Sequence, residues 1–285
     1  MLLDRFDSLF SFLAAYPQYH ARDSTFYQFL DGVAKHAFRE ARPEFEAGRA
    51  VPLGEFGPVV LPYEKMGAID SIDLFGLDEL LMFAFYHRNR GKYRRGADIG
   101  ANIGLHSILL AKCGLQMEAF EPDPVHHAKL VRNVGLNGVS GCTAHMAAVS
   151  EKKGKMEFVR VLGNTTSSHL AGAKANPYGK LERFEVDVHD VREIAARADL
   201  MKIDAEGHEA VILKALPFES WNHVDAFVEI GSPENACAVF DHFARSGVNI
   251  FSQKLCWGRA VRIEDVPSSY KEGGVFVSSK SSMPW

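Results

Sequence analysis

Long hydrophobic runs are missing from this 285-residue chain. The longest unbroken apolar stretch, LLMFAFY at 80–86, has seven residues, whereas a membrane-spanning helix needs about 20. The amino-terminal stretch carries Asp4 and Asp7, where a secretory signal would be basic and then apolar. We therefore expect no membrane span and a cytoplasmic protein.

Paired cysteines, zinc motifs and an excess of basic charge are missing as well. The four cysteines stand far apart, and the twelve histidines form no HExxH motif. These absences give a zinc site no support. Lys and Arg number 32 against 36 Asp and Glu, a net charge of −4, so no face is obviously basic enough for a nucleic-acid duplex. We expect no nucleic-acid partner.

What the chain does contain, over residues 94–285, is a regular alternation of strand and helix patterns. Helical stretches such as 104–113, 124–137 and 206–216 separate β-rich stretches such as 116–121, 142–149, 199–204 and 224–231. Strands that alternate with helices predict an α/β fold, in which a mostly parallel sheet carries helices on both faces. Residues 94–285 are therefore expected to form the main domain.

Residues 1–93 lie outside this alternation and form a predicted appendage. Apolar residues at helical spacing predict helices over 2–15, 23–41 and 77–90. A stretch rich in Gly, Pro and β-formers between the last two predicts short strands. Because these helices carry apolar faces that need a partner, we expect the appendage to cover a substrate crevice or to build a homodimer.

A glycine-rich turn, GADIGANIG at 96–104, follows the first strand of the main domain and indicates a nucleotide site. The spacing differs from the GxGxxG of dinucleotide sites, and Asp98 would repel a pyrophosphate placed there. The same acid suits the ammonium group of a methionine moiety. Glu121, at the end of the next strand in FEPDP, is placed to accept hydrogen bonds from ribose hydroxyls. Together these acids favour S-adenosylmethionine over NAD(P).

A second group of ionisable residues lies in MKIDAEGHE, 201–209. Asp204 stands at the predicted end of a strand, and Glu206 and His208 fall in the predicted first turn of the next helix. Glu229 ends the neighbouring strand in FVEIG. Asp204 could simply cap that helix, with acids at its positive end. Crowding of ionisable groups at the ligand edge of a sheet is, however, typical of an active site.

The motifs DIGANIGLHS, FEPDP, LVRNVGLNG, AAVSEKKGKMEF and MKIDAEGHE, in this order, resemble the FkbM family of S-adenosylmethionine-dependent methyltransferases. The resemblance covers about residues 95–231. It implies the class I methyltransferase fold, a Rossmann-like seven-stranded sheet whose last strand is antiparallel. It also implies O-methylation, commonly of hydroxyls on sugars or natural products. The cofactor-binding residues that it implies are Asp98, Gly100, Asn102, Gly104, Glu121 and Asp204.

We therefore expect an enzyme that methylates a hydroxyl of a sugar, glycoside or other small molecule and releases S-adenosylhomocysteine. An aliphatic hydroxyl needs a base to accept its proton, and the candidates are Asp204, Glu206, His208 and Glu229. A Mg²⁺ held by Asp204 and Glu229 is an alternative, although the predicted site contains no metal. Two other functions stay open: an NAD(P)-linked enzyme that acts on a sugar, and a non-catalytic nucleotide-binding module.

Overall fold

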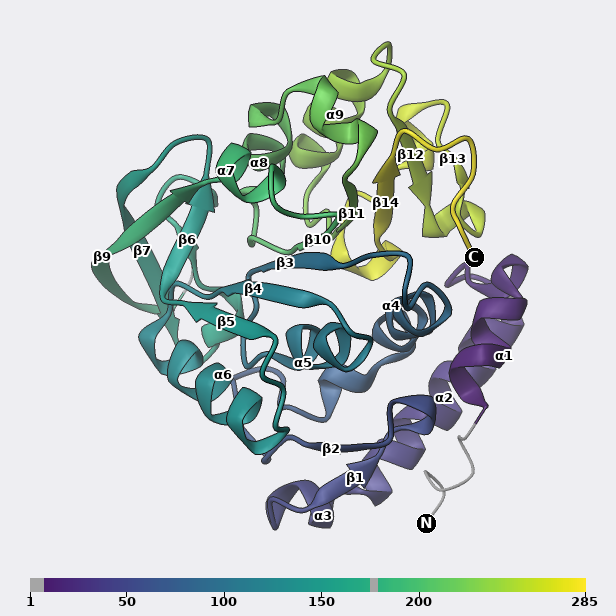
Figure 1. The fold of residues 1–285 in the computed structure, drawn as a ribbon, viewed down its shortest axis with the longest axis vertical. Coiled ribbons are helices and arrows are strands. Elements are labelled where there is room, and N and C mark those ends of the chain that lie inside the picture. Colours follow the sequence, from purple (N-terminus) through teal and green to yellow (C-terminus); the bar gives the residue numbers. More distant parts are fainter. Residues whose placement is uncertain (1–7, 175–178) are drawn as a thin grey trace.

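A twisted central sheet organises the computed structural model, which describes residues 8–174 and 179–285 (Figure 1). Within these residues the sheet has eight strands in the order β13-β12-β14-β11-β10-β3-β4-β5. They are β3 (Arg95–Ile99), β4 (Gln116–Phe120), β5 (Cys142–His145), β10 (Leu200–Ile203), β11 (Asp225–Val228), β12 (Asn249–Ser252), β13 (Gly258–Arg259) and β14 (Val275–Ser278).

The pairing of these strands confirms the predicted fold. Strands β5, β4, β3, β10 and β11 run parallel, and β14 is antiparallel to both β11 and β12. The expected seven strands are present, and the two-residue β13 adds an eighth at the edge. Every residue of β10, β11, β12 and β14 is buried, because helices cover both faces of the sheet.

Two groups of helices enclose the sheet (Figure 1). On one face lie α4 (Leu77–Arg88), α5 (Leu105–Lys112) and α6 (Pro124–Leu136). On the other lie α7 (Val191–Ala195), α8 (Glu209–Ala215) and α9 (Pro233–Phe243). The helix predicted over 206–216 is therefore shorter than expected, since α8 begins only at Glu209.

A second sheet of four strands stands beside the first (Figure 1). Its order is β6 (Ala147–Ser150), β9 (Lys180–Asp190), β7 (Gly154–Leu162) and β8 (His169–Leu170). The single strand predicted over 142–149 is wrong, because the chain leaves the central sheet after His145 and enters the second sheet at Ala147. The sequence CTAHMAAV has no Gly or Pro to signal that break.

The amino-terminal part packs against the face of the sheet that α4 and α5 cover. It contains α1 (Leu9–Ala15), α2 (Thr25–Glu40), α3 (Arg42–Glu46) and the hairpin of β1 (Ala50–Pro52) and β2 (Pro58–Val60). Its buried side chains form one continuous hydrophobic core with α4, α5 and the sheet. Residues 2–7 of the predicted first helix lie outside the described residues. None of the described helices is long and apolar enough to cross a bilayer.

Candidate active site

The carboxyl ends of four neighbouring parallel strands meet at one edge of the central sheet. The residues that follow these strands are Gly100 after β3, Glu121 after β4, Asp204 after β10 and Glu229 after β11. The backbone N–H of Asp204 donates to the Ile99 carbonyl at 3.0 Å, so the strand pairing continues into this edge. In open α/β sheets such an edge is where ligands bind.

Close contacts with the protein's own backbone and side chains determine the shape of the glycine-rich turn at this edge. Gly100 has a φ of +76°, and a Cβ built there would lie 1.8 Å from the carbonyl oxygen of Asp204. Glycine is required here because two strand ends approach each other closely. Gly104, with φ +91°, precedes α5, and its added Cβ would meet Leu130 at 3.1 Å.

Glu121 is buried at the end of β4 and is held by backbone N–H groups. Asn102 donates to its Oε2 at 2.8 Å, and Asp123 donates to its Oε1 at 2.9 Å. Burial raises the pKa of Glu121 to about 8, although both N–H bonds act in the opposite direction. The carboxylate of Glu121 thus links the turn after β3 to the segment that follows β4.

Lys202 is a central residue of the site that the sequence analysis did not include. It pairs in register with the fully buried Asp98, and its Nζ lies 3.8 Å from the Oδ1 of that residue. The same Nζ donates to the Gly100 carbonyl at 3.2 Å and to Asp204 Oδ2 at 3.3 Å. Burial acts to lower the pKa of Lys202, but the carboxylates of Asp204 and then Asp98 outweigh it and raise the pKa.

The sequence did contain a signal for Lys202. It stands two residues before Asp204 in MKID, so both side chains leave β10 on the same face. Asp98, in contrast, is fully buried and does not reach an open surface, where we expected it to meet the methionine moiety. Its Oδ2 accepts a hydrogen bond from Ser107 Oγ at 2.6 Å, and its Oδ1 has no hydrogen-bond partner within the described residues.

Carboxylates gather on the Asp204 side of the edge. The charge of Asp204, followed by burial, raises the pKa of Glu229 well above its ordinary value, and Glu79 of α4 adds to this effect. Burial, followed by the charge of Asp204, raises the pKa of Glu206 to about 7. Glu206 forms an ion pair with Lys174 at 2.5 Å. Its backbone φ is +51°, a strained conformation for a residue other than glycine.

His208, in contrast, turns away from this group, and Glu209 is bound by the loop that precedes α8. The His208 Nε2 lies 2.8 Å from Ser150 Oγ on β6, and burial lowers the pKa of this histidine. Glu209 accepts hydrogen bonds from the N–H groups of Ala205 and Gly207, and so fixes the loop before α8. His208 is the N-cap residue of α8. Asp204 therefore does not cap this helix, and the alternative that gave Asp204 only a capping role is wrong.

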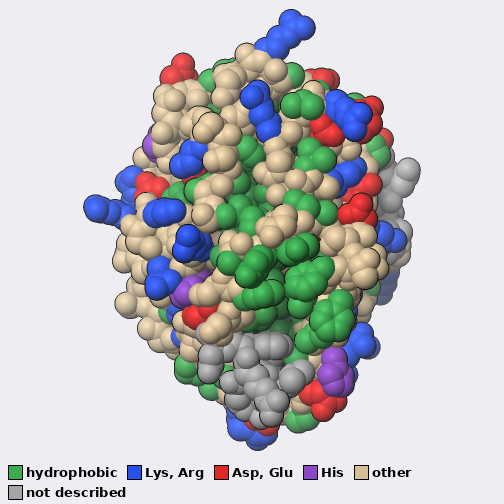
Figure 2. Space-filling model, turned by 90° about the vertical axis from the view of Figure 1, so that its right-hand side faces the viewer, with side chains coloured by type: hydrophobic (Ala, Val, Ile, Leu, Met, Phe, Trp, Pro, Cys, Tyr) green, Lys and Arg blue, Asp and Glu red, His purple; other side chains and the backbone are tan. Residues whose placement is uncertain are grey.

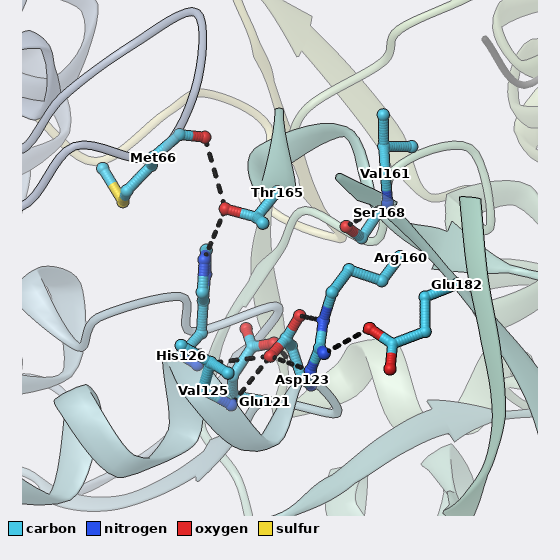
Figure 3. A network of polar contacts seen from close by, with 10 residues as sticks. All are labelled: Met66, Glu121, Asp123, Val125, His126, Arg160, Val161, Thr165, Ser168 and Glu182. Carbon is cyan, nitrogen blue, oxygen red and sulfur yellow. Dashed lines mark hydrogen bonds and ion pairs between the residues drawn. The ribbon is translucent and has the colours of Figure 1, made fainter. Parts of the chain in front are cut away.

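A network of polar contacts extends from Glu121 to distant parts of the chain (Figure 3). Asp123 caps α6 and forms a two-bond ion pair with Arg160 of β7, at 2.6 and 2.8 Å. His126 Nε2 lies 2.8 Å from Thr165 Oγ1, and Thr165 in turn donates to the Met66 carbonyl at 3.2 Å. The second sheet and the amino-terminal part therefore both hold the segment that follows β4.

A metal site has no clear set of ligands here. Within residues 8–174 and 179–285, no group of three or more His, Cys, Asp or Glu side chains could hold a metal ion. The ammonium group of Lys202, which binds Asp204, already supplies positive charge among the carboxylates.

Comparison with known proteins identifies relatives of this chain. The sequence profile described as the methyltransferase FkbM domain matches residues 98–246. "Methyltransferase 1" of Beauveria bassiana is 29% identical over 154 residues, which cover 46% of this chain and 61% of that protein. "Methyltransferase sdnD" of Sordaria araneosa is 34% identical over 170 residues, which cover 48% of this chain and 66% of that protein. The matched region is thus under two thirds of either relative.

Solved structures show a more distant likeness. The crystal structure of cofactor-bound Rv0187 from MTB is 13% identical and has a TM-score of 0.42, with coverage of 88% of this chain and 94% of that one. The strand order of the central sheet therefore remains the stronger evidence for the fold.

Proposed function

Since this chain belongs to the FkbM methyltransferase family, we propose that it methylates a hydroxyl group of a sugar, a glycoside or another small molecule, with S-adenosylmethionine as the methyl donor. The observation that carries the proposal is the group of carboxylates, Asp204, Glu206 and Glu229, beside Glu121 at the carboxyl edge of the sheet. Such a group offers both a ribose ligand and a base.

Glu121 has the chemistry of a ribose ligand. An ionised carboxylate offers about four acceptor sites, and the N–H groups of Asn102 and Asp123 occupy two of those on Glu121. Two sites remain for the two hydroxyls of a ribose. The methyl donor supplies an electrophilic methyl group on a sulfonium. In this proposal Asp98, Gly100, Asn102 and Gly104 form the methionine end of the site, and Asp98 acts there through Lys202.

Glu206 is the residue that we propose as the base. Its side chain is partly exposed, at 36%, and its pKa of about 7 suits proton transfer near neutral pH. Lys174 holds its Oε2, which leaves Oε1 to accept the proton of the acceptor hydroxyl. Asp204 keeps Lys202 in place and keeps Glu206 basic through its charge. Glu229 adds negative charge, and His208, bound to Ser150, takes no part.

Product analysis tests the proposed reaction. The purified protein would be incubated with S-adenosylmethionine and a panel of glycosides and lipid-linked sugars. We expect S-adenosylhomocysteine to accumulate with one acceptor, and mass spectrometry and NMR to locate the new methyl group on oxygen. A methyl group on carbon or nitrogen would contradict O-methylation. Cofactor binding without turnover of any hydroxylated acceptor would instead support the non-catalytic module.

A substitution of Glu206 tests the assignment of the base. We predict that Glu206→Gln lowers turnover on the order of 10²-fold and leaves cofactor affinity unchanged. The wild-type rate should rise as the pH passes through about 7, because the base must be ionised, and this rise should vanish in the variant. Glu234→Gln, an exposed carboxylate on α9, is the matched control. Normal turnover by Glu206→Gln would assign the base to another residue.

A further inference from the structure

A basic cluster lies at the edge of the central sheet opposite to the candidate active site. The stretch HRNRGKYRR, 87–95, joins the end of α4 to the start of β3. Four of its side chains, Arg88, Arg90, Lys92 and Arg94, are exposed, and we call these four the basic cluster. The net charge of −4 conceals this local excess of positive charge.

The basic cluster has no acidic partner within the described part of the chain. Arg90 contacts the carbonyl of its neighbour His87 at 3.1 Å, and Lys92 donates to Asn89 at 2.9 Å. By comparison, the adjacent Arg95 pairs with Asp199 at 3.0 Å. The positive charge of the cluster is therefore available to a partner outside this chain.

An aromatic patch adjoins the basic cluster. It consists of Phe12 and Tyr16 at α1, Tyr19 of the short helix η2 (Pro17–Tyr19), and Phe26 of α2. Three of these rings are between 41% and 43% exposed, and neighbouring rings lie 4.9–6.4 Å apart. Figure 2 shows hydrophobic side chains gathered on this face of the molecule. Contiguous exposed apolar surface of this kind marks an interaction site.

Helix α1 joins the two features into one surface. Ser11 and Ala15 of α1 line a hollow of about 460 Å³, and His87, Arg88 and Arg90 form its other wall. Phe12 and Tyr16 follow these two small residues on the exposed side of the same helix. A ligand in the hollow would thus touch basic side chains on one side and have aromatic rings close by on the other.

We propose that this surface binds an anionic membrane, with the aromatic patch at the level of the lipid headgroups and the basic cluster against lipid phosphates. Tyrosine and phenylalanine rings favour the membrane interface, and Arg and Lys are attracted to anionic lipids. In a symmetric dimer through the same surface, the basic cluster of one copy would face either the basic cluster or the aromatic patch of the other, and neither supplies the negative charge that the cluster lacks. The proposal is independent of the methyl acceptor.

Vesicle sedimentation of the full-length protein tests the proposal. We expect binding to vesicles of phosphatidylcholine mixed with phosphatidylserine, little binding to phosphatidylcholine alone, and release at high salt. Arg88→Gln combined with Arg90→Gln should lower the partition coefficient by roughly tenfold or more. Phe12→Ser combined with Tyr16→Ser should lower it as well. Lys152→Gln combined with Lys153→Gln, in the exposed turn between β6 and β7, is the charge-matched control and should bind normally.

Several results would overturn the membrane proposal. They are a wild-type protein that does not bind the anionic vesicles, an equal loss in the lysine control, and normal binding by the arginine variant. A dimer in sedimentation velocity that the aromatic substitutions dissociate would assign this face to a second copy instead. Each variant is first compared with the wild type by thermal unfolding. If the aromatic variant does not fold, the arginine variant and its control decide the outcome.

Discussion

Asp204 and Lys202 form the ion pair around which the other charged side chains of the candidate site are arranged. We predict that Asp204→Asn lowers turnover on the order of tenfold, because the loss of the Asp204 charge makes Glu206 a weaker base. The melting temperature should fall little, because the Gly100 carbonyl and Asp98 still face the Lys202 ammonium. Steady-state kinetics and thermal unfolding check both expectations. Full activity in a well-folded variant would give Asp204 a purely structural role.

Glu121 should make cofactor binding depend on pH. Burial raises the pKa of its carboxyl group from 4.5 to about 8, and ribose hydroxyls bind best to the ionised form. We predict that affinity for S-adenosylhomocysteine rises by up to about tenfold per pH unit below this pKa and levels off above it. The free energy of unfolding of the ligand-free protein should fall as the pH rises from about 4.5 to about 8. The buried Glu121 carboxyl group stabilises the folded state only while it is protonated.

Calorimetric titration at a series of pH values measures this dependence. Glu121→Gln is the control, because the amide has a similar shape and does not titrate. We expect weaker binding and a flat pH profile in the variant. A profile that keeps the wild-type slope would mean that another group, such as Glu206, is responsible.

At the scale of elements, the contact between α6 and the second sheet depends on Arg160. This side chain and its partner Asp123 are only 12% and 2% exposed, so Arg160→Met leaves a buried carboxylate without its counter-charge. We predict a loss of about 3 kcal/mol in the free energy of unfolding, together with weaker cofactor binding, because Asp123 positions Glu121 through its N–H. Urea unfolding and calorimetry measure the two effects.

Arg183→Met is the matched control for this prediction. Arg183 lies on β9 of the same small sheet and pairs with Glu157, and both side chains are about half exposed. Solvent screens such a pair, so its loss should cost less than about 1 kcal/mol. Equal effects of the two substitutions would show that the Asp123 pair has no special role.

The elements of the central sheet could be predicted from the sequence because their signals are local. Buried strand patterns and Gly- or Pro-bounded helices predicted the succession of β3, β4, β10 and β11 along the chain, and with it the strand ends that carry Glu121, Asp204 and Glu229. Two local predictions were wrong. The break between β5 and β6 has no turn residue to mark it, and α8 starts late because Glu209 holds the preceding loop through its side chain.

Contacts between distant segments could not be predicted in this way. Arg160, Thr165 and Met66 come from three separate regions of the chain, and no spacing pattern relates them to Glu121. The central place of Lys202 between two acids also requires the pairing of β3 with β10, which the sequence does not specify by itself.

At the scale of the whole molecule, the amino-terminal part should be needed for folding. Phe10, Phe38 and Phe45 are almost fully buried in the core that this part shares with one face of the sheet. Deletion of residues 1–60 would expose that core to water, so we predict loss of cooperative thermal unfolding rather than a selective loss of acceptor turnover. Circular dichroism measures the transition. A truncated protein that melts cooperatively and binds cofactor would support an independent domain over residues 94–285.

The pairing of β3 with β10 also has a consequence for how fast the protein reaches its native state. Leu200 pairs with Gly96, 104 positions earlier in the chain, and the second sheet is formed entirely by the residues between β5 and α7. Closure of so long a loop costs conformational entropy before the contacts between the strands form, and this slows folding. During synthesis, β3 cannot pair with β10 until the ribosome has released the chain beyond Asp204, so one edge of β3 stays uncovered and is open to chaperones and to aggregation.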